Sequence, residues 1–243
     1  MTTPVLAESV KGKGRHYRHP ATDELLPSVT NVIGILDKHL QYWAAREVAQ
    51  AAVTMKASLG SMTDEDVLDV LKGAPFRRSS RAAGRGTDIH AWMEAAMLFQ
   101  PLPALEGDAL NYQAAAESWL TQVKPTTLFT EVTLFHPGYA GTADAIISVD
   151  GETWLIDFKT SKAIYDEAAL QLSALFGCFI DKHGDALPWR DAEFEYTTVP
   201  DLLVVRIGED GWEEKKVADP LRSLRVFFSL LEAWNWKHEK AYE

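Results

Sequence analysis

The spacing of hydrophobic residues along the chain changes period twice. Up to about residue 125, apolar positions recur every three or four residues, which predicts helices that each bury one face. From about residue 129 to residue 159, runs rich in aromatic and β-branched residues predict three consecutive strands. Helical spacing then returns, and late strands and a final helix follow. This order predicts a mixed α/β fold or an α+β fold.

The expected elements have approximate bounds. Helices are expected at 28–36 with Ser28 as cap, 40–57, from Thr63 to a break at Gly73-Ala-Pro75, around 89–97, 108–123, 168–179 and from Asp219-Pro220 onward. Strands are expected at 129–135, 142–149, 153–159, 193–199 and 202–207. The glycine-broken stretch Lys11–His19 predicts a loop or a short hairpin.

Composition and charge narrow the class of protein. The 243 residues are 47% hydrophobic and 24% charged, which is typical of a globular protein and excludes disordered and fibrous classes. No apolar run is long enough for a membrane helix, and no secretory signal is visible, so we expect a cytoplasmic protein. The single cysteine, Cys178, excludes an internal disulfide. A net charge of −11 argues weakly against non-specific binding to nucleic acid.

The most informative local signal is a hairpin. Asp150-Gly151 lies between two strand-like runs and predicts a two-residue turn, so each residue pair across the hairpin sums to 301. This register sets Asp144 opposite Asp157 on one face, with Lys159 two residues further along that face. Opposed carboxylates repel unless a cation lies between them, and oxygen ligands at this separation suit Mg²⁺ or Mn²⁺. The alternative is an ordinary hairpin with exposed aspartates.

Several motifs occur in a familiar order. They are Arg85-Gly-Thr-Asp-Ile-His90, Phe129-Thr-Glu131, Gly141-Thr-Ala-Asp144, Asp157-Phe-Lys159 and Gln171, preceded by Pro27-Ser-Val-Thr30. Together they resemble the PD-(D/E)xK nuclease superfamily in its RecB-like exonuclease branch, which includes CRISPR-associated and phage-borne exonucleases and the mitochondrial genome-maintenance exonuclease. The motif-bearing part spans about residues 81–180. The resemblance implies an α-β-β-β-α-β nuclease core at 81–208 within a single domain, 1–243. It also implies a helical N-terminal region at 28–72 that covers the DNA path, and a C-terminal helix at 219–241.

The chain departs from this family pattern at three points. Ala143 stands where the superfamily name implies proline, and Leu175 stands where many relatives have a tyrosine that belongs to a DNA-contact motif. The iron–sulfur cluster of many CRISPR-associated relatives needs four cysteines, so this chain cannot hold one.

The resemblance also implies roles for individual residues. His90, Asp144, Asp157 and the Phe158 carbonyl are expected to ligate Mg²⁺ or Mn²⁺, and Lys159 to help activate the attacking water. Glu131 and Gln171 are expected to support the metal site or position the substrate. Taken singly, His90 and Gln171 are more often structural or solvated positions, so the argument depends on their joint occurrence.

Two groups of basic residues are candidate DNA contacts. The first, Arg77, Arg78, Arg81 and Arg85, precedes the His90 motif, where an entering strand would need positive charge. For the second, Lys11, Lys13, Arg15 and Arg18, ordinary surface charge is the favoured interpretation. Tyr42 and Trp43 are interpreted as core residues rather than base-stacking platforms.

Three functions are open. The leading one is a metal-dependent DNA exonuclease that prefers single-stranded ends and serves replication, repair or recombination in a phage or bacterium. The second is a structure-specific or flap endonuclease, and the third is a non-catalytic DNA-binding or CRISPR-adaptation subunit. A recombinase or annealing protein is a candidate partner, and oligomeric rings occur among relatives. No membrane association is expected.

Overall fold

The computed structural model describes residues 6–36, 40–180 and 199–239. The chain divides into two compact units, one formed by Met1–Ile35 with Ile89–Glu243 and the other by Leu36–Asp88. The helical region expected at 28–72 has different bounds from the second unit. The helix after Ser28 belongs to the first unit, and the second unit extends to Asp88.

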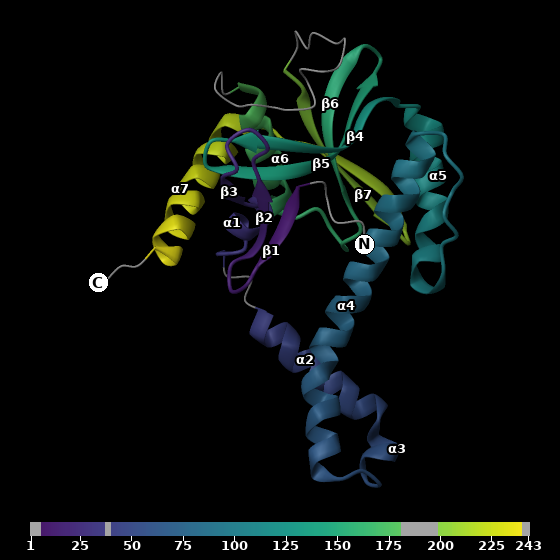
Figure 1. The fold of residues 1–243 in the computed structure, drawn as a ribbon. Helices are drawn as coiled ribbons and strands as arrows, with labels where there is room; N and C mark the ends of the chain where they lie inside the picture. Colours follow the sequence, from purple (N-terminus) through teal and green to yellow (C-terminus); the bar gives the residue numbers. More distant parts are fainter. Residues whose placement is uncertain (1–5, 37–39, 181–198, 240–243) are drawn as a thin grey trace. The chain divides into compact units, whose positions relative to one another are not determined.

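A five-stranded mixed sheet forms the centre of the first unit, which confirms the mixed α/β class (Figure 1). Its strands in spatial order are β4 (Thr126–His136), β5 (Tyr139–Val149), β6 (Glu152–Lys159), β7 (Asp201–Gly208) and β8 (Gly211–Lys216). Neighbouring strands are antiparallel except β6 and β7, which are parallel. A parallel pair needs a crossover connection, and helix α6 (Asp166–Ile180) lies in it.

Helices cover both faces of this sheet. The 3₁₀ helix η1 (Gly107–Tyr112), helix α5 (Gln113–Val123) and the end of α4 (Asp64–Met97) pack on one face, where Trp119 and Phe158 are buried. Helices α1 (Val29–Ile33), α6 and α7 (Pro220–His238) pack against one another on the opposite side, as Figure 1 shows for α5 and α7. Helix α7 begins as the sequence predicted, with the Asp219 side chain accepting from the Arg222 N–H and proline in the first turn.

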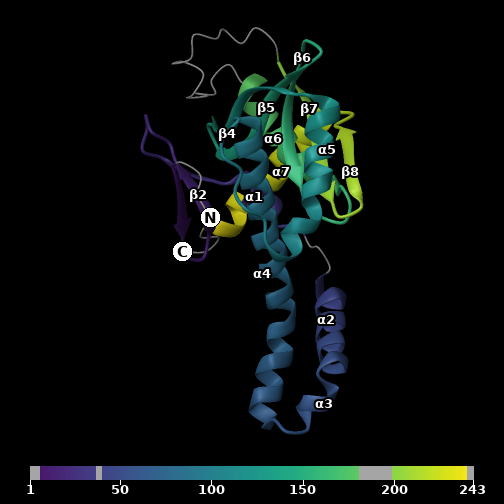
Figure 2. The ribbon, with the colours of Figure 1, turned by 90° about the vertical axis from the view of Figure 1, so that its right-hand side faces the viewer.

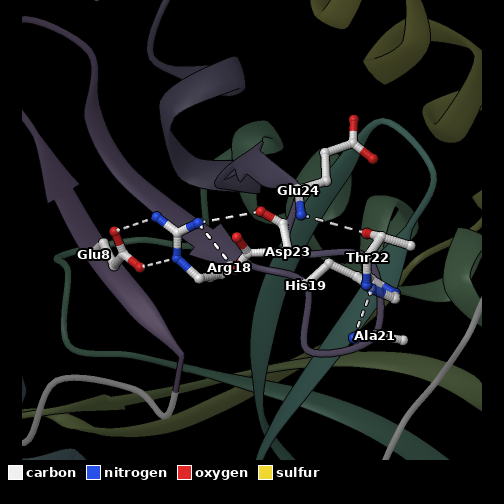
Figure 3. Close-up of polar contacts among 7 residues, drawn as sticks. All are labelled: Glu8, Arg18, His19, Ala21, Thr22, Asp23 and Glu24. Atoms are coloured by element: carbon white, nitrogen blue, oxygen red, sulfur yellow. Dashed lines mark hydrogen bonds and ion pairs between the residues drawn. The ribbon is translucent and has the colours of Figure 1, made fainter.

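The N-terminal segment forms a second, three-stranded antiparallel sheet. Its strands are β1 (Ala7–Val10), β2 (Gly14–Arg18) and β3 (Leu25–Pro27). Arg18 pairs with Glu8 at 2.6 Å and with Asp23 at 3.2 Å. Figure 3 shows these contacts and the His19 side chain, whose Nδ1 accepts from the Ala21 N–H. Arg18 is therefore engaged within its own sheet, which favours the surface-charge interpretation for this residue over a DNA contact.

The second unit is helical, with α2 (Leu40–Thr54), α3 (Lys56–Leu59) and the first part of α4 (Asp64–Met97). The expected break at Gly73-Ala-Pro75 is wrong, because α4 continues through Pro75 (Figure 2). A proline removes one helical hydrogen bond, a local cost that the good helix formers on either side can offset. Tyr42 is 81% exposed, so its interpretation as a core residue is also wrong.

Two further differences concern the late strands. The sequence did not predict β8, which pairs with β7 through a tight turn at Gly208 and Gly211. Most of the strand expected at 193–199 lies outside the described residues. Among the described helices, none combines the length and the apolar run that a membrane span requires.

Candidate functional site

The hairpin formed by β5 and β6 has the predicted register. Its pairs run from Val149↔Glu152 to Ala145↔Ile156. Asp150 and Gly151 have φ values of 51° and 86°, the two positive values that a type I′ turn requires. Beyond the last of these pairs, Asp144 Oδ2 accepts the Phe158 N–H at 2.6 Å, so the side chain of Asp144 continues the contact between the two strands. The carboxylates of Asp144 and Asp157 interact electrostatically at this end of the hairpin.

Asp157, Lys159 and Gln171 form a closed set of hydrogen bonds. Lys159 Nζ lies 2.8 Å from Asp157 Oδ1 and 3.0 Å from Gln171 Oε1. Gln171 Nε2 donates to the same Asp157 Oδ1 at 2.8 Å. Because Gln171 lies on α6 and the other two residues lie on β6, the crossover helix fixes the orientation of the lysine. The structure thus brings Gln171 to the predicted site.

His90 approaches the same place from α4. Its Nδ1 lies 3.6 Å from Asp144 Oδ1. The imidazole stands edge-on to the Phe158 ring with centroids 6.2 Å apart, and Trp119 packs on that ring in the same manner at 5.4 Å. The buried aromatic layer under the sheet therefore holds the histidine beside the hairpin.

Burial and charge shift the pKa values of these groups in different directions. The pKa of Asp157 is raised to about 6, because burial raises it more than the Lys159 charge lowers it and the Asp144 charge adds to the rise. Burial also acts to raise the pKa of Asp144, but His90, Lys159 and the Phe158 N–H outweigh it and hold that pKa below its usual value. For His90, burial lowers the pKa, yet the two carboxylates overcome it and raise the pKa to about 9. Two positive side chains, Lys159 and His90, thus balance the carboxylates of the buried Asp157 and the half-buried Asp144.

Glu131, another predicted residue, also reaches this site. Thr130 pairs with Ala145 and Val132 with Ala143, so the register of β4 places Glu131 beside Asp144. Its φ of 49° is a left-handed backbone conformation within β4. Burial, together with the charges of Asp144 and Glu94, raises the pKa of Glu131 to about 7.

Glu94 was missed by the sequence analysis. It lies one helical turn after His90 on α4, and Thr130 Oγ1 is 3.4 Å from its Oε1. The four-residue spacing from His90 would have placed it on the same helix face.

The donor set fits a hard divalent cation. Two carboxylates, one imidazole and the carbonyl of Phe158 are ligands that Mg²⁺ or Mn²⁺ accepts. Asp157 Oδ2 is buried and receives no hydrogen bond within the described part of the chain, although Lys159 Nζ is 2.6 Å away. The described side chains form no preassembled group of three His, Cys, Asp or Glu ligands. Lys159 and the imidazole of His90 contact the carboxylates that a cation would use.

The four predicted DNA-binding arginines belong to the second unit. Arg77, Arg81 and Arg85 recur every four residues on α4 and so follow one side of that helix. Arg78 pairs with Glu47 of α2 at 3.6 Å, and a guanidinium N–H of Arg77 donates to the Val70 carbonyl. Arg77 and Arg78 are thus partly engaged within their own unit.

Comparisons with known proteins give little information. No protein-family model matches the chain, and no curated protein does. Among solved structures, one described as "Crystal structure of SSO0001" matches with 18% sequence identity and a TM-score of 0.31. The match covers 54% of this chain and 59% of that chain, so this chain spans less than two thirds of that protein's length. A likeness this distant carries no argument about function.

Proposed function

We propose that this protein is a metal-dependent deoxyribonuclease of the RecB-like branch of the PD-(D/E)xK superfamily, acting as an exonuclease on single-stranded DNA ends. The observation that carries the proposal is the convergence of Asp144, Asp157, Lys159, His90 and Gln171 at one end of the β5–β6 hairpin. These are the residues to which the family resemblance assigns the chemistry. An ordinary exposed hairpin would not bury Asp157 and half-bury Asp144 beside a lysine and a histidine.

The order of the elements supports the same proposal. Helices α4 and α5 precede the three strands β4, β5 and β6, after which α6 crosses over to β7. This is the α-β-β-β-α-β order expected for the nuclease core. The additional strand β8 extends the sheet beyond β7 and leaves that order unchanged.

The chemistry of phosphodiester hydrolysis explains why these residue types are needed together. His90, Asp144, Asp157 and the Phe158 carbonyl would hold Mg²⁺ or Mn²⁺, which supplies Lewis-acid activation of water and phosphate when bound. The ammonium group of Lys159, held by Gln171, offsets negative charge that develops on the phosphate oxygens. Glu131, whose pKa of about 7 lets it exchange a proton near neutral pH, lies beside Asp144 and can accept or return a proton there.

Binding of the DNA strand is assigned to the arginines of the second unit. Arg81 and Arg85 with Arg77 line one side of α4, and such a stripe suits the regular phosphates of a nucleic-acid backbone. Mutation of these residues should weaken binding across all sequences and reduce its salt dependence.

A cleavage assay with strand-end labels tests the proposal. Single-stranded DNA labelled at the 5′ or the 3′ end is incubated with Mg²⁺, Mn²⁺ or EDTA and with wild type, Asp144→Ala, Lys159→Ala or the turn control Asp150→Asn. We expect metal-dependent release of short products by the wild type and the control only. Cleavage of closed single-stranded circles would favour the endonuclease, and DNA binding without hydrolysis under every metal condition would favour the non-catalytic subunit.

A further inference from the structure

The segment 160–165 connects β6 to α6 and leaves directly from the proposed active site. It begins after Lys159 and ends at Tyr165, six residues before Gln171. Because a helix rises about 1.5 Å per residue, the backbone of Tyr165 lies about 9 Å along the helix axis from that of Gln171. The side chain of Gln171 is itself bonded to Lys159 Nζ at 3.0 Å. Tyr165 thus lies on the segment that leads from Lys159 into the helix that carries Gln171.

This segment presents an aromatic ring and a cation to solvent. Tyr165 is 58% exposed. Lys162 is also exposed, and its ammonium group forms no ion pair with any described residue. Ser161 Oγ donates a hydrogen bond of 2.7 Å to the Ala163 carbonyl, so the backbone on either side of Lys162 is joined. Exposed single aromatics are ordinary, but here the cation and the ring both follow the half-buried Lys159 within six residues.

We propose that segment 160–165 holds the nucleotide next to the scissile phosphate, with the Tyr165 ring stacked on its base and Lys162 in contact with its phosphate. This inference rests on the proposed nuclease function and adds the residues that select the strand. An aromatic ring with a nearby cation is the combination that binds single strands without sequence preference. Because stacking on a protein ring requires an unstacked base, these contacts favour a single-stranded end over a duplex.

The first test asks whether the Tyr165 ring stacks on a base of the bound strand. Tyr165→Ala should weaken single-stranded DNA binding and raise KM by about 5- to 150-fold, the range observed when one stacked base is lost, while kcat changes little. Tyr165→Phe should keep most of the affinity. On a substrate with an abasic site beside the scissile bond, wild type and Tyr165→Ala should differ by less than about 2-fold. Trp236→Ala, which removes a ring that is 71% exposed on α7, is the matched control.

The second test asks whether Lys162 contacts a phosphate of the strand. It also separates the proposal for segment 160–165 from the nuclease proposal. Lys162→Ala should reduce the slope of log affinity against log salt concentration by about 0.7, and Lys237→Ala on α7 should leave it unchanged. Binding is measured in EDTA with a 2-aminopurine base near the strand end, so it does not depend on hydrolysis.

If the wild type binds the strand but never cleaves it, the nuclease proposal fails while the fluorescence change still reports on Tyr165. The proposal for segment 160–165 is overturned if Tyr165→Ala binds like wild type, if it loses as much affinity on abasic DNA, or if the wild type holds no single strand.

Discussion

Replacing Asp157 by asparagine should make the metal-free protein more stable near neutral pH. The pKa of this carboxyl is raised from 3.8 to about 6, chiefly by burial and then by Asp144. A raised carboxyl pKa means that ionisation is less favourable in the folded protein than in the unfolded chain. At 1.36 kcal/mol per pKa unit, this shift lowers the free energy of unfolding by about 3 kcal/mol at pH values above 6.

The pH dependence follows from the sign of this shift. Below pH 3.8 both states are protonated and the cost vanishes; it grows between pH 3.8 and 6 and is constant above that. Asparagine resembles the protonated carboxyl and does not carry the cost. The gain of Asp157→Asn should therefore reach about 2–3 kcal/mol at pH 7.5 and fall close to zero at pH 4.

Urea unfolding in EDTA, followed by circular dichroism between pH 4 and 8, measures this difference. Asp150→Asn is the matched control, because it changes an aspartate of the same hairpin at the turn and should show no such pH-dependent gain. The electrostatic reasoning is refuted if Asp157→Asn is less stable than wild type at pH 7.5, or if the difference does not change with pH. Asp157→Asn should also lose the hydrolytic activity. The ionised Asp157 would then lower stability while being required for function.

Three further predictions concern packing, backbone and metal. Trp119→Ala should cost about 3–5 kcal/mol in urea unfolding, because it empties the space beneath Phe158; a loss below 1 kcal/mol would contradict this packing. Gly141→Ala should cost about 1–3 kcal/mol, because a Cβ there would lie 2.8 Å from Leu175 Cδ2; unchanged thermal stability would show that the neighbours can move. Added Mn²⁺ should raise the Tm of wild type but not of Asp144→Ala, and equal shifts would place the ion elsewhere.

The local pattern of the sequence determined the hairpin that carries the candidate site. Asp150-Gly151 dictates a type I′ turn, and a two-residue turn leaves one register for the strands on either side. Because side chains alternate between faces, that register also sets Asp157 and Lys159 on the same face. The capped start of α7 is equally local and was equally predictable.

Only the tertiary structure decided which distant residues complete the site. His90 and Gln171 come from helices whose positions depend on how α4 and α6 pack on the sheet, and no local pattern specifies that packing. Glu94 joins the site for the same reason. Local rules also failed to predict that α4 continues through Pro75. A proline favours a helix break, but the residues around it favour a helix, and the proline alone does not decide the outcome. Short-range geometry is encoded by adjacent residues, whereas long-range contacts arise from the summed burial of the whole core.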